Sequence, residues 1–322
     1  MKVRIGVDVG GTNIVCGVVS PGGLLIQKIK QPTETARGSE YVLGKIAGII
    51  RQAVELAGLT MEDVECVGVG TPGLVDPSSG VTVFAGNLGW HNVPVADILS
   101  RHLNLPVKVD NDVRMYVLGE AVRGAGRGYK HVLGITVGTG LAAAFVEDGR
   151  LFYGSRSMAG ELGHICFNEI PYVCSCGLTG CLETVASATG LVRQALTRLQ
   201  DGADSSLRGL LRADGSPSEG LTAAAIAEAY DAGDSLAIEI MNNTGVLLGK
   251  GLAYAITLFS PDCVVIGGGV AAAGERLLQP MKEQIRRSVL PQYDINTAIV
   301  TAELPDDAGV IGSSIYASSR LN

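Results

Sequence analysis

The sequence contains few of the residues on which most metal and redox sites depend. Of its 322 residues only four are histidine, seven are cysteine and one is tryptophan, and charged residues make up 18%. Basic residues form no run and the formal net charge is −7, so nucleic acids and anionic membranes are poor candidates for partners. The odd number of cysteines and their spacing do not suggest a disulfide-linked secreted domain, and they favour a reducing compartment.

Long apolar runs are also missing. The longest, residues 132–146, falls short of the roughly 20 residues of a membrane-spanning helix and is rich in glycine and alanine. The opening segment MKVRIGVDVGG has Asp8 where a signal peptide would need its apolar centre. We therefore expect a cytoplasmic protein. With 47% hydrophobic residues, the chain is large enough to form two lobes.

Hydrophobic periodicity indicates an α/β protein. It predicts strands at 3–9, 14–20, 64–70, 106–109, 132–149 (a hairpin), 263–270 and 297–304, and helices at 39–57, from about 113, 183–199, 222–231, 235–256, 277–288 and from about 308. Residues 132–149 repeat the plan of residues 3–23, in which two strands flank a turn of glycine and threonine. This repeat suggests two related lobes, each opening with a hairpin whose tip presents backbone NH groups.

The first hairpin tip, DVGGTN, has glycines that follow a strand. Their spacing does not match G-x-G-x-x-G, and a second strand follows instead of a helix, which argues against a dinucleotide-binding fold. Such a tip can still bind phosphate through the NH groups of Gly10 and Gly11 and the hydroxyl of Thr12. Asp8 would repel phosphate unless Mg²⁺ lay between them. The alternative is a tight hairpin with an exposed aspartate.

Two further glycine clusters favour the phosphate interpretation. Residues 138–140 (Gly-Thr-Gly) form the tip of the second predicted hairpin, and residues 267–269 are three consecutive glycines at the end of a buried strand. Three glycine turns at strand ends, distributed over two lobes, suit a nucleotide held in a cleft between the lobes.

Residues 163–184 contain four of the seven cysteines and one of the four histidines. Cys174, Cys176 and Cys181, with His164 upstream, supply the four ligands of a closed tetrahedral zinc site. Buried thiols beside a core histidine are the alternative, but independent burial would not cluster them. A catalytic zinc would need an open position, and an iron–sulfur cluster is less compatible with histidine.

Two carboxylates, Glu161 and Glu183, flank this cluster in the sequence. A zinc-bound imidazole has its second nitrogen protonated and fixed in direction. A rigid N–H donor between two carboxylates is suited to binding a polyhydroxyl ligand, so we expect the metal to organise a binding wall.

Seven motifs in this order carry a resemblance: DVGGTN, TPGLVD, DND, GTG, GELGH, CSCGLTGCLE and TVASATG. The sequence resembles the ROK family of sugar kinases and sugar-responsive repressors, and most closely its bacterial glucokinases, from about residue 3 to about residue 315. The pattern H-x₉-C-x-C-G-x₂-G-C-x-E, matched from His164 to Glu183, is the most specific part of the resemblance.

The resemblance implies a two-lobed actin-like ATPase fold of the ribonuclease H-like type, with a central cleft for nucleotide and sugar. The small lobe would comprise residues 1–120 and a C-terminal helix at about 306–322, and the large lobe, residues 121–305, would carry the zinc site. The implied roles are as follows: Asp112 is the catalytic base; Gly73, Asn87, Asn111, Asp112, Glu161, His164 and Glu183 bind the sugar; Asp8, Gly10, Gly11, Thr12, Thr139, Gly140, Gly267, Gly268 and Gly269 face ATP and Mg²⁺; His164, Cys174, Cys176 and Cys181 bind zinc.

Some positions remain ambiguous. Spacing alone does not choose between Asp110 and Asp112 as the base, and the resemblance selects Asp112, leaving Asp110 as a residue that caps a turn. We expect Arg114 to be a solvated helix residue; the alternative is a positive charge near the phosphates. Where relatives have further glycines, residues 142–144 are alanines, which puts close approach of the nucleotide there in question.

The expected reaction is transfer of the γ-phosphoryl group of ATP to the 6-hydroxyl of a hexose, with glucose the first choice. Mannose, fructose, allose and N-acetylmannosamine remain alternative acceptors, and polyphosphate an alternative donor. A sugar-responsive repressor is less compatible, because the first core strand already begins at Val3 and a DNA-binding helix-turn-helix normally precedes it. A non-catalytic sugar sensor should have lost Asp8, Asp112 or a glycine tip. The resemblance also implies a homodimer or homotetramer.

Overall fold

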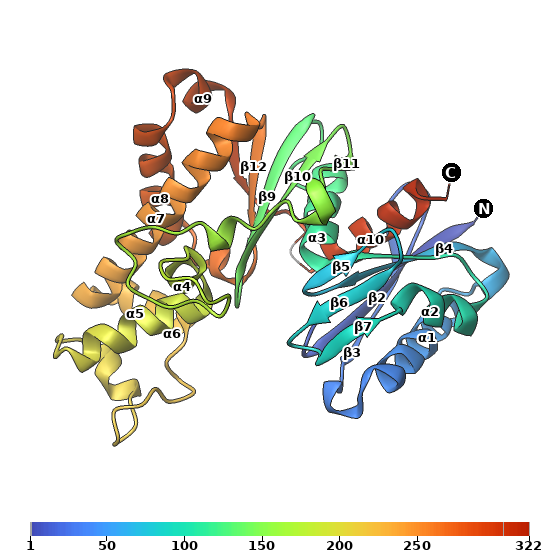
Figure 1. Ribbon diagram of the computed structural model, residues 1–322, viewed down its shortest axis with the longest axis horizontal. Helices are drawn as coiled ribbons and strands as arrows, with labels where there is room; N and C mark the ends of the chain where they lie inside the picture. Colours follow the sequence, from blue (N-terminus) through green and yellow to red (C-terminus); the bar gives the residue numbers. More distant parts are fainter. Residues whose placement is uncertain (1, 305, 322) are drawn as a thin grey trace. The chain divides into compact units, whose positions relative to one another are not determined.

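The computed structural model describes residues 2–304 and 306–321, and the chain folds into two compact units (Figure 1). The first unit comprises Met1–Val132, Ala144–Ala159 and Ala302–Asn322, and the second comprises Leu133–Ala143 and Gly160–Thr301. The chain thus leaves the first unit and returns to it twice. These bounds differ from the predicted ones, since the first long segment ends near residue 132 instead of 120, and residues 144–159 belong to the first unit.

A five-stranded sheet with the order β3-β2-β1-β4-β8 forms the centre of the first unit. The first three strands are antiparallel neighbours, whereas β1–β4 and β4–β8 are parallel pairs. The predicted hairpin is therefore present, and β3 extends it at the sheet edge with alternating exposed residues. The strands are β1 (Val3–Val9), β2 (Asn13–Val19), β3 (Leu25–Pro32), β4 (Val64–Thr71) and β8 (Val107–Asn111).

Helices cover both faces of this sheet (Figure 1). On one face α1 (Ser39–Leu56) and α2 (Val95–Leu103) share a buried core with the alternate apolar residues of β1. On the other face α10 (Ala308–Ser319) packs against α3 (Asp112–Arg123), β1 and β4. A β-carbon on Gly6 or Gly68 would lie 1.8 Å from a carbonyl oxygen of α10, so only glycine permits this close contact.

A three-stranded antiparallel sheet, β5-β6-β7, is inserted between β4 and β8 in the first unit. Its strands are β5 (Leu74–Asp76), β6 (Val81–Ala85) and β7 (Trp90–Val93). The sequence analysis missed this sheet because the strands are short. Its importance is positional, since Gly73 precedes β5 and Asn87 lies in the turn between β6 and β7.

The second five-stranded sheet has the order β11-β10-β9-β12-β13. Three consecutive strands form one edge and two later strands complete it, as in the first sheet, so the weak internal repeat corresponds to a repeated topology. The strands are β9 (His131–Val137), β10 (Leu141–Glu147), β11 (Arg150–Leu151), β12 (Cys263–Gly267) and β13 (Ala298–Thr301). The last two are shorter than the predicted 263–270 and 297–304.

The rest of the second unit is mainly helical, with α7 and α8 packed side by side (Figure 1). The helices are α4 (Glu183–Ala186), α5 (Ala188–Gln200), α6 (Ala223–Asp231), α7 (Ser235–Phe259), α8 (Glu275–Ser288) and α9 (Pro291–Asn296). The predicted continuous helix 183–199 is wrong: Ser187 is extended and its side chain accepts a hydrogen bond from the NH of Gly190, capping α5. Across residues 2–304 and 306–321, no helix combines the length and apolar character needed to cross a bilayer.

Candidate active site and metal centre

The DND motif occupies the junction between β8 and α3 in the first unit. Asn111 ends the strand and caps the helix, since its Oδ1 accepts a hydrogen bond from the NH of Arg114 at 3.2 Å. Its Nδ2 donates to the carbonyl of Gly73 at 3.0 Å, which brings together two predicted sugar-binding residues. Asp112 is the first residue of α3, and its Oδ1 accepts a hydrogen bond from the NH of Val113 at 2.9 Å.

Two carboxylates of the first unit interact electrostatically at this junction. Burial raises the pKa of Asp112 to about 6, although hydrogen bonds from the first turn of α3 oppose the shift. Burial, and then the charge of Asp112, raise the pKa of Asp8 to about 7. A carboxylate that titrates near the working pH can accept a proton, and a second one nearby is suited to a divalent cation.

The first glycine tip lies beside a residue predicted to bind sugar. A β-carbon on Gly11 would lie 3.3 Å from both the Cβ and the carbonyl oxygen of Asn87. Thr33, which the sequence analysis missed, fixes this tip: its hydroxyl donates to the carbonyl of Gly10 at 2.6 Å and its NH to the carbonyl of Thr12 at 2.9 Å. Thr33 is fully buried, and no local pattern distinguishes it.

The second glycine tip belongs to the second unit and lies against Glu183. Oε2 of Glu183 accepts a hydrogen bond from the NH of Leu141 at 2.9 Å, and a β-carbon on Gly140 would approach the same oxygen to 2.6 Å. The carbonyl of Thr139 accepts a hydrogen bond from the hydroxyl of Thr189 at 3.1 Å. The alanines at 142–144 lie within β10, beyond the tip.

The glycines at 267–269 have three different positions in the second unit. Gly267 is the last residue of β12. Gly268 has φ 87°, and a β-carbon there would lie 2.5 Å from the carbonyl oxygen of Val137, so both conformation and packing require glycine. Gly269 lines a cavity of about 260 Å³. Of the three, Gly269 is thus the one at the cavity wall.

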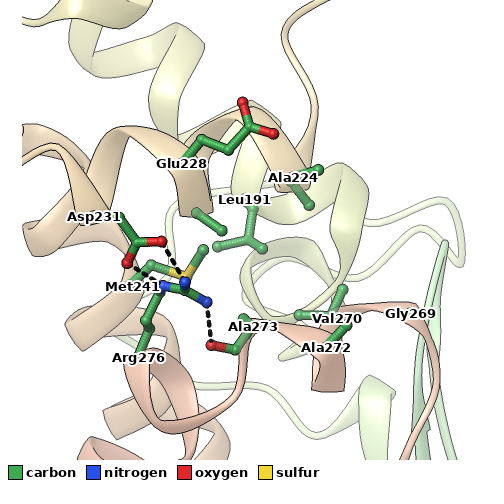
Figure 2. A pocket seen from close by; sticks show the side chains of 12 residues that line it. Leu191, Ala224, Glu228, Asp231, Met241, Gly269, Val270, Ala272, Ala273 and Arg276 are labelled. Carbon is green, nitrogen blue, oxygen red and sulfur yellow. Dashed lines mark hydrogen bonds and ion pairs between the residues drawn. The ribbon is translucent and has the colours of Figure 1, made fainter.

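This cavity has mainly apolar walls and a polar corner (Figure 2). At that corner Arg276 forms a bidentate ion pair with Asp231, and its Nη1 donates to the carbonyl of Ala273 at 2.9 Å. Glu228 projects from α6 at another side of the cavity (Figure 2). Small residues, mostly alanine, leave the space open, which suits a flat ring system.

The predicted metal ligands converge in the second unit. One ligand atom from each of His164, Cys174, Cys176 and Cys181 lies within 4.8 Å of the others. Sγ of Cys174 is 3.7 Å from Nδ1 of His164, and the Sγ atoms of Cys176 and Cys181 are 3.5 Å apart. Tetrahedral zinc with bonds of about 2.0–2.3 Å requires ligand separations of about 3.5–3.8 Å, and both of these distances fall in that range, so the donor set fits that ion. Zinc would hold these thiols as thiolates.

The neighbours of this cluster add two details. Because Nδ1 of His164 faces Cys174, its Nε2 is directed elsewhere and lies 3.8 Å from Oε2 of Glu161. Cys166, which the sequence analysis left unassigned, is exposed, and its Sγ lies 4.0 Å from that of Cys181. Two of the predicted sugar contacts, Glu161 and His164, are therefore neighbours.

The expectation for Arg114 is wrong. Its side chain is buried, and its Nη1 donates to Oδ1 of Asp110 at 3.0 Å. Asp110 is fully buried, and its other oxygen accepts a hydrogen bond from the hydroxyl of Tyr153 at 2.7 Å. Asp110 does accept a turn hydrogen bond from the NH of Asn111, but it is chiefly part of a buried ionic network.

Known proteins of one family match this chain over nearly its whole length. The glucokinase of Halalkalibacterium halodurans is 37% identical over 99% of this chain and 96% of its own length, and that of Thermotoga maritima is 35% identical over 98% of each. A ROK family glucokinase from Streptomyces griseus, solved in complex with glucose and AMPPNP, is 34% identical with a TM-score of 0.79 over 98% of this chain and 99% of that one. The ROK family model matches residues 4–320, and the chain belongs to the ROK family, with its actin-like ATPase fold.

Proposed function

We propose that this chain is an ATP-dependent glucose kinase that transfers the γ-phosphoryl group of ATP to the 6-hydroxyl of the sugar. The observation that carries the proposal is Asp112, a carboxylate with a raised pKa at a strand–helix junction beside Asn111. Glucokinases that match the whole chain support it, and one of them was solved with glucose and an ATP analogue.

In this mechanism Asp112 orients the attacking hydroxyl and accepts its proton. Phosphoryl transfer has a loose transition state, so positioning and charge neutralisation provide most of the catalysis, and general-base assistance contributes about 10²–10⁴-fold. Mg²⁺, when bound with ATP, would neutralise the phosphates, and Asp8 is the residue suited to hold it, through water. Asn111 is held by Gly73 and by α3, so its amide is fixed beside the base.

The remaining sugar and nucleotide contacts are assigned from the family resemblance and the local geometry. The resemblance assigns sugar binding to Gly73, Asn87, Glu161, His164 and Glu183. The tips at 10–12 and 139–140 would bind phosphates through backbone NH groups. The adenosine would occupy the cavity that Gly269 lines, where the alanine walls leave room for a purine.

We infer that the metal of the cysteine cluster is zinc with a structural role. Four protein ligands complete a tetrahedral site, so no coordination position remains for substrate. Nδ1 of His164 is on the side of the thiols, which leaves Nε2–H to donate towards a sugar hydroxyl near Glu161.

The test is ADP release with Mg-ATP and a panel of hexoses at equal concentration, run beside Asp112→Asn. The proposal predicts turnover with glucose, and a loss of at least about 100-fold in the variant while glucose still binds by calorimetry. Turnover with another hexose would retain the mechanism and replace the substrate. Absence of turnover with every hexose would refute the proposal.

A further inference from the structure

A buried ionic network is built around Asp110, the first residue of the DND motif. Asp110 is fully buried, and both of its carboxylate oxygens are occupied. Oδ1 accepts hydrogen bonds from Nη1 of Arg114 at 3.0 Å and from the NH of Asn111 at 2.7 Å, and Oδ2 accepts one from the hydroxyl of Tyr153 at 2.7 Å. The chemistry described above leaves this network without a role.

Arg114 connects three segments of the first unit. Besides binding Asp110 at the end of β8, its Nη2 donates to the carbonyl of Ser157, and its guanidinium lies 5.3 Å from the centre of the Tyr153 ring. Its own NH donates to the side chain of Asn111. Only a planar guanidinium with several donors can satisfy the carboxylate and a carbonyl while remaining over an aromatic ring.

The position of this network along the chain determines what it can affect. Asn111 and Asp112 are the next two residues after Asp110, so the backbone that carries them begins at the residue Arg114 holds. Removing the guanidinium would take away the cation that hydrogen-bonds this buried carboxylate, which is unfavourable. Arg320, which lies over the Tyr153 ring and also interacts electrostatically with Asp110, would remain but donates no hydrogen bond to Asp110 among those described. The carboxylate would have to admit water or take up a proton, and either change would move the end of β8. A displacement of about 1 Å at a reacting group costs on the order of 10²-fold in rate.

We propose that Arg114 is a positioning residue for phosphoryl transfer, which holds Asn111 and Asp112 in register with the sugar hydroxyls through its contacts with Asp110 and Ser157. This inference rests on the proposed function, because it assumes that Asp112 is the base. It assigns to Tyr153 the lesser role of fixing the second oxygen of Asp110. Arg114 itself contacts neither substrate in this scheme.

The experiment compares Arg114→Met, Arg114→Lys and Tyr153→Phe with the wild type, using steady-state kinetics and calorimetric glucose binding. Arg114→Met should lower kcat about 10–100-fold and raise the KM for glucose, with the KM for Mg-ATP within about twofold. Arg114→Lys should lower kcat less than Arg114→Met does, since lysine keeps the positive charge but lacks the planar group with several donors. Tyr153→Phe should change the same constants in the same direction by a smaller factor.

The matched control is Arg4→Met, which breaks a partly buried ion pair with Glu65 (2.9 Å) elsewhere in the same unit. Rates are expressed per folded molecule, from the unfolding transition of each variant. If Arg114→Met resembles Arg4→Met, with a lower melting temperature but unchanged kcat and glucose KM, the role is structural and the inference is wrong.

Should Arg114→Met fail to fold, Arg114→Lys and Tyr153→Phe provide the same comparison, and wild-type constants in both would also overturn the inference. The activity of the wild type distinguishes failure of the proposed function from failure of this inference. A wild-type enzyme that turns over no hexose removes the proposed function, and the inference with it. An active wild type with unaffected variants removes the inference alone.

Discussion

The raised pKa of Asp112 predicts a specific pH dependence of catalysis. The base must be ionised, so kcat/KM should follow the ionised fraction of a group with a pKa of about 6. From that value about 90% of Asp112 is ionised at pH 7 and about 10% at pH 5, so kcat/KM should fall roughly tenfold between them. With the ordinary aspartate pKa of 3.8, the fall would be under about 10%.

The assay is kcat/KM for glucose between pH 4.5 and pH 8, at saturating Mg-ATP. Two controls isolate Asp112. Enzyme held at pH 5 and assayed at pH 7.5 must recover fully, because protons also compete with metal for the thiolates. The Asp8→Asn variant removes the neighbouring carboxylate, whose pKa is raised to about 7, so its normalised profile reports Asp112 without a coupled titration.

Two results would refute the reasoning. A profile that stays flat down to pH 5, in an enzyme that turns over, would mean that the base is a solvated carboxylate or that proton transfer does not limit kcat/KM. An acid limb that disappears in Asp8→Asn would assign the titration to Asp8. Because the pKa of Asp8 is raised to about 7, Asp8 is mostly protonated where Asp112 titrates, so its removal should leave the limb of Asp112 near pH 6.

Three other predictions concern stability and metal content. Because folding raises the pKa of Asp112, the folded state binds its proton more tightly, and this stabilising contribution is present below pH 4 and is lost as the pH rises through 6. Asp112→Asn should therefore raise the free energy of unfolding at pH 7 by about 1–2 kcal/mol, discounted for partial exposure. Denaturant melts that show equal effects at pH 7 and pH 4 would contradict this prediction. Cys181→Ser should abolish bound zinc by elemental analysis and lower the melting temperature, whereas Cys166→Ser should retain one zinc per chain. Ser157 has φ 56°, so Ser157→Gly should raise the free energy of unfolding by up to about 1 kcal/mol. The neighbouring Ser155→Gly, as a control, should lower it. If Ser157→Gly does not raise the free energy of unfolding, the backbone of that turn is not strained.

The parts of the fold that the sequence predicted are those with local signals. Alternating apolar residues and glycine turns located both hairpins, and the repeat between residues 3–23 and 132–149 corresponds to two sheets with the same strand order. The break at Ser187 was missed because a single serine within a helical pattern barely disturbs the periodicity of the apolar residues. The sheet of β5 to β7 was missed because its strands have three to five residues.

The convergence of the four candidate metal ligands was predictable for the same reason, since they lie within 18 residues and each is of a rare type in this chain. The network of Asp110, Arg114 and Tyr153 was not, because Tyr153 is 43 residues from Asp110 and the ion pair has ordinary helical spacing. An arginine in the first turn of a helix is usually solvated, and only the burial of Asp110 reverses that expectation.

The glycine tips illustrate how a motif can be recognised for one reason and maintained by another. The sequence suggested that Gly140 and Gly11 are glycines so that phosphate can approach the backbone. Each also lies close to a neighbour within its own unit, since a β-carbon on Gly140 would approach the carboxylate of Glu183 to 2.6 Å and one on Gly11 would lie 3.3 Å from Asn87. Both neighbours are assigned to the sugar and not to the nucleotide. A side chain at either tip would therefore displace a sugar contact even before ATP binds, and phosphate binding alone is not a sufficient account of why these positions are glycine.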